Sequence, residues 1–196
     1  MAKFFGNLNL VVGVGVVLAL AIMLGLDAPS FGGTTACIKM MFVWLHVIFG
    51  VMWIGLLYYL NFVQVPTMPK IPAEQKGAIT GHIAPKVFWY FRYAALLTVI
   101  TGIVVAWNGG YLVSALLFQD GGKVRLIGVG MWMALIMAFN VWFIIWPAQK
   151  KILGIVEASA EEKAAAAPRA LFASRTNLLL SIGMLYAMSA ANALVA

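Results

Sequence analysis

Charged side chains are scarce in this sequence. Only 10% of its 196 residues are Asp, Glu, Lys or Arg, whereas 64% are hydrophobic. A soluble domain carries roughly 25% charged residues, because water wets its whole surface. The hydrophobic residues also stand in long runs, which is not the alternating pattern of an outer-membrane barrel. The composition therefore excludes a soluble enzyme and predicts helices in a bilayer, where each backbone polar group must be bonded within the protein.

Cysteine and histidine are almost absent as well. Cys37 is the only cysteine, which excludes an intrachain disulfide, a Cys-rich zinc site and a c-type haem, whose attachment needs C-x-x-C-H. His46 and His82 are the only histidines. The net charge of +7 would suggest nucleic acid for a soluble protein. Here the basic residues stand between hydrophobic runs, so we expect a lipid bilayer and no nucleic acid as partner.

Five hydrophobic runs are long enough to cross a bilayer, which takes about 20 residues. They cover residues 5–26, 40–65, 88–107, 124–146 and 176–195. The first run exceeds the ~7–15 residues of a signal-peptide core, and we interpret it as a span. A shorter run, 111–118, is expected to lie in the interface. Pro168 is expected to break the helix that the alanines before it favour. The prediction is an all-α integral membrane protein, a bundle of about five transmembrane helices forming a single membrane domain, 1–196.

The basic residues are distributed unequally between the two sides of such a bundle. Ten of the 13 fall on the side of the N-terminus, namely Lys3, Lys70, Lys76, Lys86, Arg92, Lys150, Lys151, Lys163, Arg169 and Arg175, against Lys39, Lys123 and Arg125 on the other. Cytoplasmic loops are the ones enriched in Lys and Arg. We therefore expect a cytoplasmic N-terminus, an outer C-terminus and a bacterial inner membrane.

The spans hold few groups that could carry charge. Apart from Arg125 in the first turn of its run, they contain only His46 and Arg92 among Asp, Glu, Lys, Arg and His residues. Pumps and ion-coupled transporters usually need such groups at membrane depth. Transport is therefore disfavoured, and His46 becomes the main candidate for chemistry.

Helical spacing places His46, Gly50 and Trp53 on one face, at i, i+4 and i+7. An imidazole can ligate haem iron, and a glycine one turn away lets the flat macrocycle approach. His46 is therefore the candidate metal ligand of a b-type haem, with Gly50 and Trp53 beside the cofactor. The alternative is a histidine that forms a hydrogen bond inside the bundle, next to a glycine used for close helix packing.

The second axial ligand is left open. At ~1.5 Å per residue, His46 lies ~25–30 Å from the inner boundary, which separates it from His82 in the connector. Met131 and Met133 on the fourth run and Met188 on the fifth lie near the depth of His46, and a thioether can ligate haem iron. Most of the 11 methionines must nevertheless fill the core. A five-coordinate haem, or one shared with another subunit, satisfies the same pattern.

Three asparagines, Asn61, Asn140 and Asn177, stand in or beside the spans toward the inner side. We expect them to form hydrogen bonds between helices. The alternative, which is a more specific functional hypothesis, is that they line a polar substrate pocket.

Several blocks resemble the membrane region of membrane-bound urate hydroxylases, the urate oxidase N-terminal family. They are residues 44–66, with His46-Val47-Ile48-Phe49-Gly50 and Trp53-Ile54-Gly55, then 88–92, 140–151 and 174–181. Full-length members are similar in carrying a cytochrome c domain after the membrane region, and they pass electrons from urate to the respiratory chain. The family's histidine near the end of the last span has no counterpart in Met188-Ser189-Ala190-Ala191-Asn192. Only His46 carries over as a ligand.

The resemblance implies a haem-associated redox or electron-transfer component, and so a part of an oxidoreductase. Because C-x-x-C-H is lacking, it would act with a separate cytochrome or other membrane subunits. One alternative is a non-catalytic accessory subunit of a larger respiratory or photosynthetic membrane complex. Another is a permease for a small neutral solute, which the lack of intramembrane charge disfavours.

Overall fold

The computed structural model describes residues 2–27 and 34–193, and almost all of these residues are helical, with no strand among them. Five helices in this part of the chain are long and apolar enough to cross a membrane. They are Leu8–Gly25, Ala36–Lys70, Ala73–Asn108, Gly122–Ile152 and Ala160–Ala191. The prediction of an all-α integral membrane protein with five spans, in contact with lipid, is confirmed. Residues 194 and 195 of the fifth predicted run lie outside the described residues.

The chain divides into two compact units, residues 1–44 and 45–196. The first contains α1 (Ala2–Phe5), α2 (Leu8–Ile22), the π-helical turn η1 (Met23–Asp27) and the beginning of α3 (Thr34–Tyr58). Asn7 caps α2, since its side chain accepts a hydrogen bond of 3.1 Å from the Leu10 N–H. No residue of α2 is buried within this unit.

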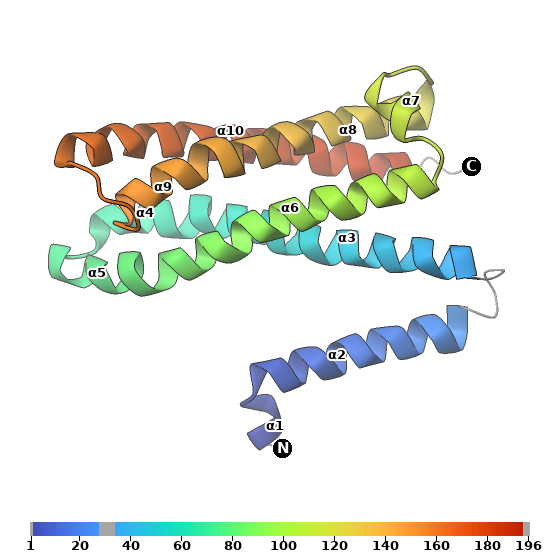
Figure 1. Ribbon diagram of the computed structural model, residues 1–196, viewed down its shortest axis with the longest axis horizontal. Coiled ribbons are helices and arrows are strands. Elements are labelled where there is room, and N and C mark those ends of the chain that lie inside the picture. Colours follow the sequence, from blue (N-terminus) through green and yellow to red (C-terminus); the bar gives the residue numbers. More distant parts are fainter. Residues whose placement is uncertain (1, 28–33, 194–196) are drawn as a thin grey trace. The chain divides into compact units, whose positions relative to one another are not determined.

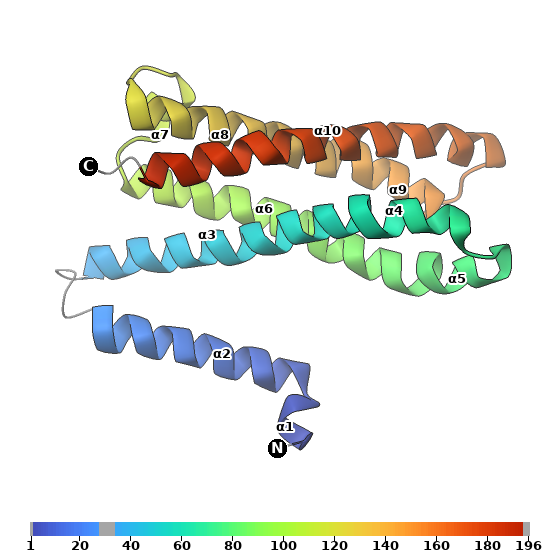
Figure 2. The same cartoon turned by 180° about the vertical axis from the view of Figure 1, so that it is seen from behind.

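The second unit contains the rest of α3 and the three spans that follow it, which Figures 1 and 2 show from opposite sides. After α3 come η2 (Tyr59–Gln64), α4 (Val65–Thr67), η3 (Met68–Lys70), η4 (Ala73–Gln75), α5 (Lys76–Ala78), η5 (Ile79–Ile83), α6 (Ala84–Asn108), α7 (Leu112–Leu116), α8 (Gly122–Phe139), η6 (Asn140–Ile145), α9 (Trp146–Ile152) and α10 (Ala160–Ala193). The short α7 lies at the end of this unit opposite α5 and α9. With five residues it is too short to span, as predicted for 111–118.

Large side chains from α3 and α6 meet small ones from α6 and α10 in the core. Trp53 and Leu57 of α3 are fully buried, and Phe91 of α6 is 1% exposed. They belong to one cluster with Ala95 of α6 and Ala173 of α10. Alanine at such positions lets helices approach closely, which is how membrane helices associate without a hydrophobic driving force. The core lies toward the half of the bundle that carries α4, α5 and α9.

Three π-helical turns precede prolines. η2, η5 and η6 end two residues before Pro66, Pro85 and Pro147. The residue before each proline donates its N–H to the carbonyl five residues back, from Val65 to Leu60, from Ala84 to Ile79 and from Trp146 to Val141. In an α-helix a proline ring would clash with the carbonyl four residues back. The wider turn moves that carbonyl aside, so the helix continues through the proline.

Pro168 does not break a helix, and that prediction was wrong. It lies inside α10, which runs without interruption from Ala160 to Ala193. The residue four positions back is Ala164, which is exposed. A carbonyl left without its helical partner there can bond to water, and the small side chains around it leave room for the ring. The lost backbone hydrogen bond at Pro168 is therefore tolerated, because this part of α10 extends beyond the core.

A capping box starts α10. The Ser159 hydroxyl accepts a hydrogen bond from the Glu162 N–H at 3.2 Å, and the Glu162 carboxylate accepts one from the Ser159 N–H at 3.0 Å. The same carboxylate forms an ion pair of 2.6 Å with Lys151 of α9. This reciprocal pattern satisfies two N–H groups that the first turn leaves free.

Replacing Ser159 with alanine is expected to lower the free energy of unfolding by about 1 kcal/mol, the usual cost of removing an N-cap hydroxyl. The measurement is reversible unfolding in mixed micelles. Ser189→Ala is the control, because the Ser189 hydroxyl only bonds to the Leu185 carbonyl of its own helix. If both variants match the wild type, the cap does not stabilise α10.

Candidate functional site

His46 forms the link between α3 and α6. Its Nδ1 lies 2.8 Å from the Thr98 carbonyl oxygen and 3.3 Å from the Thr101 Oγ1. A carbonyl oxygen only accepts, so Nδ1 carries a proton. The Thr101 hydroxyl donates to the Leu97 carbonyl at 2.7 Å, which leaves its oxygen able to accept from Nδ1. In the neutral imidazole the lone pair is then on Nε2, for which the described residues provide no hydrogen-bond partner.

Gly102 makes room for this imidazole. A Cβ at Gly102 would lie 2.8 Å from His46 Cε1 and 3.1 Å from Nδ1, closer than van der Waals contact permits. The run Thr98–Gly102 thus supplies two acceptors and a vacant side-chain position. The sequence does mark the Thr98–Gly102 segment, because two threonines and a glycine interrupt an otherwise apolar stretch. The sequence does not indicate, however, which helix this segment contacts.

Gly50 and Trp53 share the inward face of α3 with His46, as their spacing predicted. A Cβ at Gly50 would lie 3.9 Å from the Thr98 methyl group, so this glycine faces α6. Trp53 is fully buried, and its indole N–H has no hydrogen-bond partner among the described residues. Gly50 therefore serves the close approach of two helices here, in keeping with the packing alternative.

The candidate methionine ligands pack elsewhere in the second unit. The Met188 side chain lies against Gly130 of α8, where a Cβ would be 3.3 Å from its sulfur. Met131 packs against the small cluster of Ala115, Ile127 and Ala191. Both thioethers fill space around α8 and α10, whereas His46 faces α6.

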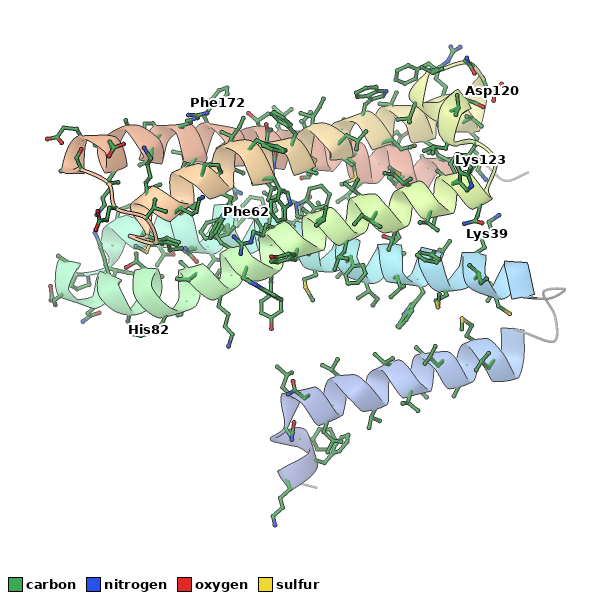
Figure 3. The ribbon with its side chains drawn as sticks, viewed as in Figure 1. Lys39, Phe62, His82, Asp120, Lys123 and Phe172 are labelled. Atoms are coloured by element: carbon green, nitrogen blue, oxygen red, sulfur yellow. The ribbon has the colours of Figure 1, made fainter. Side chains whose placement is uncertain are left out.

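His82 lies apart from His46. It is exposed in η5, at the end of the unit where α5 lies (Figure 3). Thr98, which holds His46, lies roughly 20 Å further along α6 at ~1.5 Å per residue. The separation agrees with the prediction that the two imidazoles do not share one iron.

The three asparagines form interhelical hydrogen bonds, as predicted. The Asn140 amide donates to the Asn177 Oδ1 at 2.8 Å, and the Asn177 amide donates to the Met137 carbonyl at 3.0 Å. The Asn61 amide donates to the Leu57 carbonyl and to the Ser174 hydroxyl, each at 2.9 Å. These side chains are buried and bonded to protein groups, except for Asn61 Oδ1, which has no partner among the described residues. The bonds between helices favour packing over a solute path.

The chemistry available here is that of one oriented imidazole. The described residues contain no group of three or more His, Cys, Asp or Glu side chains that could hold a metal ion. A zinc site would need such a group, whereas haem iron can be held by one histidine. A backbone carbonyl on the Nδ1–H is the usual device that fixes the tautomer of a metal-ligating histidine.

No family model, curated protein or solved structure matches the chain. The similarity to urate hydroxylases therefore rests on the sequence blocks alone.

Proposed function

We propose that this protein is the haem-binding membrane component of a redox system similar to that of the membrane-bound urate hydroxylases, and that it acts in a bacterial inner membrane with a separate cytochrome or other subunits. The observation that carries the proposal is the His46–Thr98 hydrogen bond of 2.8 Å. It orients the imidazole and leaves Nε2 as a Lewis base within an apolar bundle.

The residues present fit the ligation of a b-type haem. His46 would hold the iron through Nε2, and Thr98 and Thr101 would fix the ring by accepting the Nδ1 proton. Gly102 would leave the space that the imidazole occupies, because any side chain at this position would displace the ring. When bound, haem supplies one-electron exchange. Met131 and Met188 pack near α8 and α10, and the Met133 sulfur lies 3.3 Å from where a Cβ at Gly183 of α10 would be. His46 is therefore the one iron ligand that we assign to this chain.

The absorption spectrum of the purified protein tests this proposal. We expect a Soret band, one broad visible band after dithionite reduction, because haem iron held by one histidine is high-spin, and a shift of the Soret band on adding carbon monoxide. His46→Ala should abolish these bands, while His82→Ala should leave them unchanged, because His82 is exposed and far from the site. Urate is the first reductant to try in place of dithionite.

A colourless wild-type protein that haem does not restore would refute the proposal. His46 would then be an interhelical hydrogen-bond donor only, and the accessory-subunit hypothesis would replace the redox one. The permease hypothesis has little support, because the amides of Asn140 and Asn177 bond to one another and to backbone.

A further inference from the structure

Arg92 is a cation that has no counter-ion among the described residues. It is half-buried on α6, and its Nε is buried with no hydrogen-bond partner among the described residues. The guanidinium carbon lies 3.8 Å from the ring centroid of Trp146, 5.1 Å from that of Tyr93 and 5.9 Å from that of Trp142. Lys151–Glu162 is the ion pair present in the described part of the chain, so no carboxylate of this part neutralises Arg92.

An apolar groove adjoins this cation. It has a volume of about 380 Å³ and is lined by Leu96, Val99, Leu135, Ala138, Phe139, Trp142 and Phe143. Arg92, Leu96 and Val99 stand at i, i+4 and i+7 and therefore share one face of α6. Trp142 belongs to both features, since it lines the groove and its ring lies near the guanidinium. The guanidinium of Arg92 and the groove together form one amphipathic surface.

We propose that Arg92 and this groove bind one anionic phospholipid, with its phosphate on the guanidinium and an acyl chain along the groove. A partly buried permanent charge is costly unless an anion pairs with it. The guanidinium fork matches the oxygens of a phosphate. Tyr93, Trp142 and Trp146 are the residue types that mark headgroup depth. In the orientation predicted from the Lys and Arg distribution, this side of the chain faces the leaflet that holds anionic lipids.

An isoprenoid quinone would also suit the groove. Its head carries no charge, however, and would leave Arg92 uncompensated. The unpaired cation therefore favours the phospholipid.

The test is the lipid that stays with the purified protein. The wild type in mild detergent should retain about one phosphatidylglycerol per chain, and added phosphatidylglycerol should raise its Tm more than phosphatidylcholine does. Arg92→Gln should weaken this binding at least about tenfold, which corresponds to the loss of a charge-assisted hydrogen bond. Arg175→Gln is the matched control, because Arg175 is an exposed cation on α10 away from the groove.

Leu96→Trp keeps the charge and fills the groove, and it should reduce lipid retention even if Arg92→Gln does not fold. Equal phosphatidylglycerol retention in the wild type and both groove variants would overturn the proposal. So would a quinone in the organic extract in place of phosphatidylglycerol. A rise in Tm with inorganic phosphate as large as that with the lipid would show that the acyl chain contributes nothing, and it would also overturn the assignment.

Discussion

Replacing Gly128 with alanine is expected to cost about 3 kcal/mol of folding free energy or more, the upper range for forced overpacking. A Cβ at Gly128 would collide with the Ala115 carbonyl oxygen and lie 3.0 Å from its carbon. Ala115 is fully buried on α7, and a backbone carbonyl cannot rotate away as a side chain can. The variant must therefore lift α7 from α8 or fold incompletely.

Hydrogen exchange would locate this damage. The bond from the Trp132 indole N–H to the Leu116 carbonyl, 3.0 Å long, should be lost, and residues 111–118 should exchange faster than in the wild type. Gly55→Ala is the control, because a Cβ at Gly55 meets nothing within 4 Å and alanine is the better helix former. That variant should be as stable as the wild type or slightly more stable. Unchanged stability and exchange in Gly128→Ala would contradict the close approach of α7 and α8.

Asn177→Ala is expected to destabilise the protein by about 1–3 kcal/mol, because it leaves the buried Asn140 amide without its acceptor. Asn177 is fully buried. Its removal takes the acceptor from the Asn140 amide and one of two donors from the Met137 carbonyl, which keeps its bond from the Asn140 backbone N–H. Water cannot replace either partner in the interior of the bundle without opening the contact between η6 and α10.

A double-mutant cycle separates the energy of the Asn140–Asn177 hydrogen bond from the cost of losing side-chain volume. Asn140→Ala together with Asn177→Ala should cost less than the sum of the single variants by about 1 kcal/mol, the size of such couplings between membrane helices. Unfolding in mixed micelles gives all four stabilities. Asn108→Ala should change little, since the exposed Asn108 amide bonds only to the Val104 carbonyl of its own helix. Strict additivity would show that the two amides do not interact.

The spans could be predicted from the sequence because each needs only a long apolar run, whatever its neighbours are. The inward face of His46, Gly50 and Trp53 followed in the same way from helical spacing. The length of the helices was underestimated, since two of them continue beyond residues 65 and 146 to Lys70 and Ile152. Hydropathy reports where the apolar run ends, whereas the backbone continues as long as its hydrogen bonds can be made.

The partners of His46 were not predictable. Thr98 and Thr101 lie more than fifty residues away along the chain, at |i−j| of 52 and 55. Their contact depends on how far α3 and α6 are rotated about their axes, which an apolar run does not specify. The same limit applies to Met188, which was expected at the depth of His46 but whose side chain faces Gly130.

The π turns before Pro66, Pro85 and Pro147 have a consequence for how related chains should align. Each turn contains one residue more than an α-helix of the same length requires. A chain in which such a proline is replaced no longer needs the extra residue. Single-residue gaps should therefore appear in segments 59–64, 79–83 and 140–145 wherever the following proline is absent. Without that gap, every side chain beyond the turn would be rotated by about 100° about the helix axis.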